Sequence, residues 1–111
     1  MTTEVVFALL PRVILLDVAG PAEAFRIANR LVPGSYTLRY IGSTRAIDSA
    51  VGLRLAALRP LPKKLPASST IIVTGIAGSR VDGGDPAIVR LAKWLTHIMQ
   101  DQSHTLLCVC D

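Results

Sequence analysis

The sequence has 111 residues, which is enough for one domain and too short for two. Half of the residues are hydrophobic and 18% are charged, so the chain can bury a core and is not of the disordered class. The net charge of +4 comes from scattered basic residues, and Lys63-Lys64 is the only adjacent basic pair. This pattern is typical of a solvated surface and argues against a nucleic-acid interface within these residues.

Continuous apolar runs predict strands at residues 5–10 and 70–74. Residues 36–41 are rich in strand-forming side chains and predict another strand. Residues 50–58 alternate between apolar and small or charged side chains, which predicts a half-exposed strand near an edge of the sheet. The last apolar run, residues 105–111, predicts a buried parallel strand.

Two helices are expected between these strands. The first begins at residues 17–21, where Pro21 suits the first helical position, and runs to about Leu31. Its predicted apolar face consists of Ala24, Phe25, Ala28 and Leu31. Asp85 followed by Pro86 begins the second helix, as an N-cap and the first helical residue. Its apolar stripe is formed by Ile88, Leu91, Ala92, Leu95, Ile98 and Met99.

The order of these elements is typical of an α/β fold with a mostly parallel sheet and helices on its faces. A buried final strand needs helices on both faces of the sheet, and only two helices are predicted. We therefore expect the chain to be the amino-terminal part of a larger protein, or to be covered by another copy. The low charged fraction agrees with such a covered surface, so a homo-oligomer is expected.

Cysteine usage and the start of the chain bear on the compartment. Cys108 and Cys110 are too close along one strand for an ordinary disulfide, and no disulfide framework is present, which favours a reducing compartment. The first residues lack a basic region, and Pro11 interrupts the apolar run. No signal peptide or membrane span is predicted, and the cytoplasm is expected.

Cys110 is the most notable candidate for chemistry. It falls near the carboxyl end of the last predicted strand, where α/β sheets build their sites. One interpretation is a nucleophile on a sharp turn between a strand and a helix. The other is a small buried hydrophobe at the strand tip, and the residues alone leave both open. Cys108, two residues earlier, is expected to be a core residue.

Two more residues are expected at the same end of the sheet. Glu23, in the first turn of the predicted first helix, either holds the thiol by a hydrogen bond or simply complements the helix dipole. Gly75, after the central strand, either presents its N–H as an oxyanion donor or is a plain turn glycine. His97 and His104 are not at a strand's carboxyl end. No metal site or nucleotide-binding loop is predicted, and no cofactor is expected.

Three stretches together resemble a known superfamily. They are DVAGPAEAF at residues 17–25, TIIVTG at residues 70–75 and LCVCD at residues 107–111. They resemble the ThiJ/PfpI, or class I glutamine amidotransferase-like, superfamily, and the first looks most like the amino-terminal domain of AraC-type transcriptional regulators. The resemblance implies a flavodoxin-like three-layer sandwich, present here only as its amino-terminal part. It also implies a site with Cys110 at the elbow, Glu23 beside it, and the amide after Gly75, that of Ile76, facing them.

The resemblance implies that residues 1–111 belong to a ligand-sensing and dimerising domain. A small-molecule effector would bind near Glu23, Gly75, Ile76 and Cys110, and DNA would be bound only by a domain outside this chain. An enzyme of the superfamily, isonitrile hydratase-like or amidase-like with Cys110 as nucleophile and Glu23 as its acid partner, is the alternative. Its enzymes commonly have Pro-Gly-Gly where this chain has residues 74–76, and a small neutral residue where it has Asp111. Both departures favour the sensor, and a dimerising scaffold without a ligand is a third hypothesis.

Overall fold

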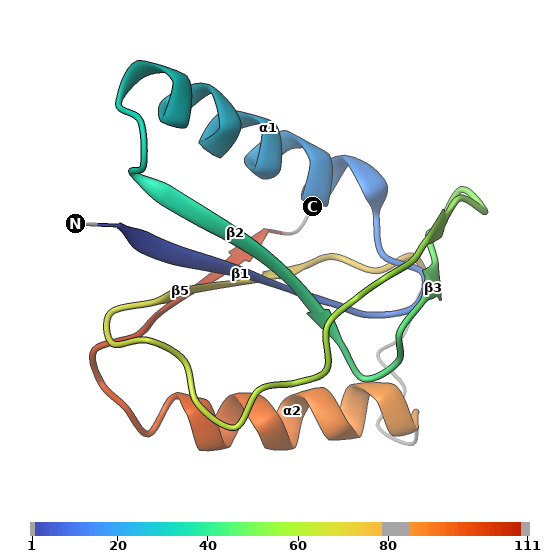
Figure 1. Ribbon diagram of the computed structural model, residues 1–111. Coiled ribbons are helices and arrows are strands. Elements are labelled where there is room, and N and C mark those ends of the chain that lie inside the picture. Colours follow the sequence, from blue (N-terminus) through green and yellow to red (C-terminus); the bar gives the residue numbers. More distant parts are fainter. Residues whose placement is uncertain (1, 79–84, 110–111) are drawn as a thin grey trace.

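The computed structural model describes residues 2–78 and 85–109 (Figure 1). Four parallel strands form one sheet in the order β2-β1-β5-β6. Helix α1 lies on one face of this sheet and α2 on the other, which confirms the predicted α/β class and mostly parallel sheet. The bounds are β1 Thr3–Leu9, α1 Leu15–Leu31, β2 Tyr36–Gly42, β5 Thr70–Thr74, α2 Pro86–Ile98 and β6 Thr105–Val109.

Strand β1 lies in the middle of the fold and supplies both halves of the core. Because successive side chains point to opposite faces of a strand, Val5 and Phe7 join the core under α1, whereas Val6 and Ala8 join the core under α2. All four are buried. The continuous apolar run at residues 5–10 therefore corresponds to a strand that is covered on both faces, as predicted.

Helix α2 begins where the sequence predicts. The Asp85 side chain accepts a hydrogen bond from the Ala87 N–H at 2.9 Å, and Pro86 is the first helical residue. Its buried face is Ala87, Leu91, Trp94 and Ile98, and the half-buried Ile88, Leu95 and Met99 pack against the same core. The predicted stripe is therefore confirmed except at Ala92. Ala92 is exposed instead, and Trp94 takes its place on the core side.

Helix α1 starts six residues earlier than Pro21, so the prediction of Pro21 at the first helical position is wrong. Leu15 is the first helical residue, and Pro21 lies inside the helix. The start is fixed by tertiary contacts, because Val13 is fully buried and the Ile14 N–H donates to the Gly75 carbonyl at 2.9 Å. The predicted face is also only partly right: Phe25 packs on the core, but Leu31 is 78% exposed.

The predicted strand at residues 50–58 is wrong as well. Only two of its residues are in a strand, β4 Arg54–Leu55, which pairs antiparallel with β3 Ile47–Asp48 in a small hairpin outside the main sheet. Gly52 and Ala57 have positive φ angles of 81° and 60°. Such backbone turns the chain, so the alternation of side chains belongs to a turn and a short hairpin.

Strand β6 is in the predicted place but is not buried. It is the edge strand of the sheet beside β5, and within residues 2–78 and 85–109 nothing pairs with its outer side. Leu107 is 44% exposed, and Cys108, expected in the core, is exposed as well. The side chains of Leu106 and Val109 still pack against the two core clusters, one on each face.

Candidate functional site

The carboxyl end of β5 meets the start of α1 and the end of β6. The Gly75 N–H donates to the Val109 carbonyl at 2.8 Å, which extends the pairing of β5 with β6. On its other side, the Gly75 carbonyl accepts from the Ile14 N–H at 2.9 Å. Gly75 therefore joins the last described residue of β6 to the residue that precedes α1. In an open parallel sheet, this carboxyl end is where ligands bind.

The backbone geometry distinguishes Gly75 from Ile76. Because the Gly75 N–H is bonded to Val109, it extends the ladder and is already occupied. Ile76 forms an isolated antiparallel bridge with Val13. The flanking hydrogen bonds, Ile14 N–H to Gly75 and Ala77 N–H to Arg12, make this a non-hydrogen-bonded pair. The Ile76 N–H consequently points away from Val13, on the side of the ladder where β6 ends.

Two buried oxygen atoms at this junction lack a hydrogen-bond partner among the described residues. They are Oδ2 of Asp17, in the first turn of α1, and Oγ1 of Thr74, the last residue of β5. The Asp17 N–H donates to the Ile14 carbonyl, and the Ile14 N–H donates to the carbonyl of Gly75. Because Gly75 directly follows Thr74, these two backbone bonds link Asp17 to the end of β5. A buried polar atom without a partner costs about 1–3 kcal/mol, and a functional role, such as bonding to a ligand, is one explanation for its presence in a native protein.

Asp17 is the residue that the sequence analysis missed. Placing Pro21 at the first helical position made Glu23 the first-turn acid, but the helix begins at Leu15 and its first-turn acid is Asp17. The sequence does contain a signal for this earlier helix start, because Asp17 directly follows the apolar residues 13–16 that leave the end of β1. A carboxylate in the first turn is also favoured by the helix dipole.

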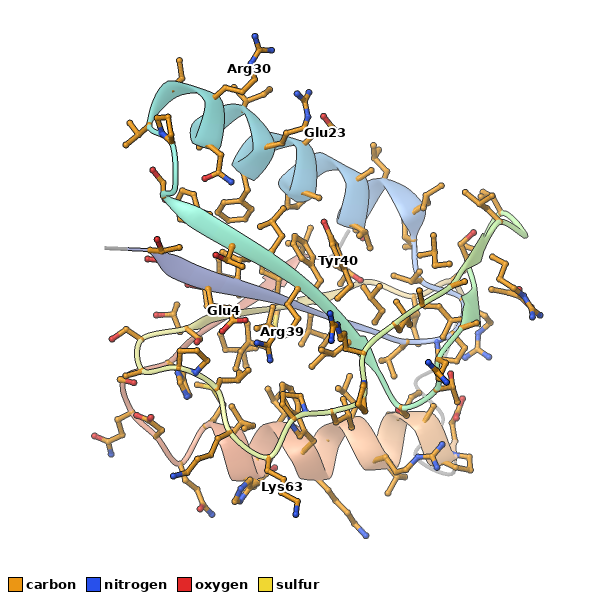
Figure 2. The ribbon with its side chains drawn as sticks, viewed as in Figure 1. Glu4, Glu23, Arg30, Arg39, Tyr40 and Lys63 are labelled. Carbon is orange, nitrogen blue, oxygen red and sulfur yellow. The ribbon has the colours of Figure 1, made fainter. Side chains whose placement is uncertain are left out.

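Glu23 lies on the solvent side of α1 (Figure 2). Its side chain is 62% exposed and forms an ion pair with Arg26 at 2.6 Å. The pKa of Tyr40 is raised above its ordinary value, first by burial and second by the negative charge of Glu23. The structure thus joins Gly75 and Ile76 to the residues that precede α1, and Asp17 follows in the first turn of that helix. Glu23 is engaged on the outer surface instead.

Cys110 and Asp111 lie outside the described residues. Cys110 follows Val109, whose carbonyl is bonded to Gly75, so the sequence continues from this junction. Both histidines are elsewhere: His97 is exposed on α2, and His104 is buried just before β6, at the amino end of the strand. Within the described residues, no cluster of His, Cys, Asp and Glu has the geometry of a metal site.

Cavities lie on both sides of the start of α1. An apolar cavity of about 380 Å³ is lined by residues of the first helical turn and by the hairpin turn, namely Ile14, Leu15, Leu16, Ala19, Ala50 and Val51. A second, of about 300 Å³, is lined by Leu9, Val18, Tyr40 and residues 54–58. Both volumes fall at the lower end of the range for small-molecule sites. No helix in the described part of the chain is long and apolar enough to span a membrane.

Comparison with known proteins shows that the fold occurs in transcriptional regulators. An AraC family transcriptional regulator from Pseudomonas putida superimposes with a TM-score of 0.60 and 22% identity over 82% of this chain. A putative transcriptional regulator from Vibrio parahaemolyticus superimposes with a TM-score of 0.73 and 11% identity over 97% of this chain. The chain spans 56% of the length of each solved structure. No protein-family model matches the sequence, and no curated protein matches it significantly.

Proposed function

We propose that the chain is the amino-terminal portion, residues 1–111, of the ligand-sensing and dimerising domain of an AraC-type transcriptional regulator of the ThiJ/PfpI type. A small metabolite binds where α1 meets the ends of β5 and β6. DNA is bound by a separate domain, outside these 111 residues. The similarity of fold to two transcriptional regulators supports this proposal, as does the motif at residues 17–25.

The pair of buried oxygens carries the ligand-binding part of the proposal. Asp17 Oδ2 accepts hydrogen bonds, and Thr74 Oγ1 both donates and accepts, so together they suit a polar group such as an amine, amide or alcohol. Because neither atom has a partner among the described residues, a ligand that bonds to both removes a desolvation cost already present in the fold.

Exposed apolar side chains support the dimerising role. Leu16 of α1 and Val51 of the hairpin turn line the same apolar cavity and are 76% and 73% exposed, and Leu53 is also exposed. Large apolar side chains gathered on a surface typically mark an interaction site. Sedimentation of the full-length protein tests this role: the double variant Val51→Ser/Leu53→Ser should shift the protein toward monomer. An unchanged dimer would place the interface elsewhere.

The alternative function is that of a superfamily enzyme with Cys110 as nucleophile. The observation that favours it is the outward N–H of Ile76, because an oxyanion needs such a donor. Against it stands Asp111, whose negative charge next to Cys110 disfavours a thiolate. Glu23, the acid partner expected for the thiol, is engaged with Arg26 on the helix surface.

Ligand binding is tested on the full-length protein with a thermal-shift screen of amines, amides, amino acids and polyols. A compound that binds the native state at 100 times its Kd stabilises it by about 2.7 kcal/mol, which gives a clear rise in Tm. The stabilisation should be lost in Asp17→Asn and Thr74→Val and kept in Glu23→Gln, which changes an exposed acid. A compound that stabilises all variants equally would place the ligand elsewhere.

Thiol labelling distinguishes the sensor from the enzyme. The variant Cys108→Ser removes the exposed thiol of β6 and leaves Cys110 as the remaining cysteine of this segment. With a sensor, Cys110 reacts at the rate of an ordinary thiol and the rate rises with pH near 8.5. A rapid reaction that persists below pH 6, together with hydrolysis of amides or hydration of isonitriles, would support the enzyme instead.

A further inference from the structure

A third pocket lies against the outer edge of β2. It has a volume of about 560 Å³, within the range of small-molecule sites. Its walls are the outer strand β2 and the segment 57–62, and its polar side chains come from Glu4, Thr37, Arg39 and Arg59. This pocket is separate from the junction at Gly75, because none of its lining residues belongs to α1, β5 or β6.

The segment 57–62 is held firmly against the sheet. The Arg59 N–H donates to the Tyr40 carbonyl at 2.9 Å, and the Arg59 carbonyl accepts from the Gly42 N–H at 3.0 Å. Farther along, the Trp94 indole N–H of α2 donates to the Pro62 carbonyl at 2.6 Å. With Pro60 and Pro62 stiffening the backbone between these anchors, the wall is preformed and needs little ordering when a ligand binds.

The edge of β2 presents a short stretch of unpaired backbone. Tyr36, Leu38, Tyr40 and Gly42 face outward, since Thr3 bonds to Ser35 on the inner side. The Asn29 side chain satisfies both backbone groups of Tyr36, at 2.8 and 2.9 Å, and Arg59 occupies the Tyr40 carbonyl and the Gly42 N–H. Among the described residues this leaves the two backbone groups of Leu38 and the Tyr40 N–H without a partner, beside the pocket.

This open edge is too short for an added strand, which usually has at least three residues. Ala57, with its φ of 60°, turns the segment away from β2 on the amino-terminal side of Arg59, so the ladder does not extend to Leu38. The unpaired N–H groups are therefore suited to a small molecule with an acceptor group, rather than to an extended peptide.

The charges that line the pocket determine whether the acceptor group of the ligand should be neutral or charged. Glu4 is 10% exposed and is paired with Arg39 at 2.7 Å, so its charge is largely neutralised (Figure 2). Arg59 has no acidic partner within the described residues. The lining thus carries one net positive charge, which attracts a monoanion. A dianion such as phosphate is less favoured, because the lining offers one unpaired positive charge and cannot balance a second negative charge.

We propose that this pocket binds a small organic carboxylate, with Arg59 as its ionic partner and the N–H groups of Leu38 and Tyr40 as further donors. A guanidinium matches a carboxylate in a two-bond geometry, and two backbone N–H groups add direction. The site is a second ligand site, and it stands whether or not the junction at Asp17 binds a metabolite.

The test uses calorimetric titration of the full-length protein with sodium propionate and with inorganic phosphate, at constant ionic strength. Propionate should bind saturably, and Arg59→Gln should weaken it about tenfold or more, as expected for a lost charged hydrogen-bonding partner. Arg54→Gln is the matched control, because it removes the same charge from an exposed guanidinium that does not line this pocket. Asp17→Asn should leave propionate binding unchanged.

Selective labelling of tyrosine with ¹⁵N locates the ligand. The amide resonance of Tyr40, identified by its disappearance in Tyr40→Phe, should shift with propionate in the wild-type protein and in Arg54→Gln. Three results would overturn the proposal: equal losses of affinity in Arg54→Gln and Arg59→Gln, phosphate binding as tightly as propionate, or no saturable binding of propionate at tens of millimolar.

Discussion

Replacement of Thr74 by valine tests whether the hydroxyl at the end of β5 is truly without a partner. Thr74 is 7% exposed, and its Oγ1 has no hydrogen-bond partner among the described residues. Valine has nearly the same shape and a high preference for strands, so the change removes the hydroxyl and little else. In most proteins, the loss of a buried hydroxyl is destabilising, because it breaks a hydrogen bond.

At Thr74 the opposite sign is expected. A hydroxyl that is buried without a partner costs about 1–3 kcal/mol, so its removal should stabilise the ligand-free protein by a similar amount. For a domain of 150–250 residues, each 1 kcal/mol raises the Tm by about 2–4 °C. If the proposed metabolite bonds to this hydroxyl, the same variant should also bind it more weakly, so that stability and affinity change in opposite directions.

Thermal unfolding of the full-length protein followed by circular dichroism measures the effect. Thr105→Val is the control, because Thr105 is an exposed strand residue and its replacement should change stability by less than about 0.5 kcal/mol. A lower Tm for Thr74→Val would refute the reasoning, since it would show that the hydroxyl has a partner in the folded protein. The junction would then lose one of its two ligand-binding atoms.

Three further predictions concern other parts of the fold. Asn29→Ala removes both side-chain hydrogen bonds to the edge of β2, at 2.8 and 2.9 Å, and should cost about 1–3 kcal/mol in urea unfolding. The pKa of Asp101 lies below 3.8, chiefly because the Ser103 N–H donates to it; its contribution to stability is therefore present above that pH and lost as the pH falls through the lowered value. Ser103→Ala keeps that N–H but removes the Ser103 hydroxyl, whose hydrogen bond to Asp101 is the second cause, so it should raise the pKa of Asp101 slightly in a ¹³C carboxyl titration. The pKa of Tyr40 lies above 10.0 through burial and, secondarily, the charge of Glu23, so its contribution to stability is present below pH 10 and lost as the pH rises through the raised value. Glu23→Gln should lower the pKa of Tyr40 slightly in an absorbance titration at 295 nm.

The elements that sequence reasoning predicts well are those whose neighbours matter least. Strand β1 is recognisable because it is apolar on both faces, and α2 because Asp85 and Pro86 fix its start through local hydrogen bonding and geometry. The start of α1 is different. No side chain caps Ile14, and the helix begins there because Ile14 is bonded to Gly75, a contact across 61 positions that local patterns do not encode.

The order of strands in the sheet explains the other errors. Strand β6 is apolar enough for a central strand, but it lies at the edge of the sheet, and the exposure of Leu107 and Cys108 follows from that place rather than from their type. The sequence places a candidate site at the end of β5, and ligand binding there stays a prediction. The first-turn acid of α1 was predicted wrongly, because the error of six residues in the start of this helix put Glu23 in the place of Asp17.

Among the described residues, buried polar side chains are hydrogen-bonded at the amino end of the sheet but not all of them are at its carboxyl end, and this contrast supports the position of the candidate site. At the amino end, His104 is buried with its polar atoms used: its Nδ1 accepts from the Ser69 N–H at 3.2 Å, and its Nε2 lies 3.5 Å from the Asp101 carboxylate. At the carboxyl end, Asp17 and Thr74 each have a buried oxygen without a described partner. His104→Ala should therefore cost about 1–3 kcal/mol of stability and leave metabolite affinity unchanged. Asp17→Asn should do the reverse, reducing affinity at little cost in stability. Parallel loss of both properties in either variant would show that the two ends are not independent, and the buried oxygens would no longer locate the ligand.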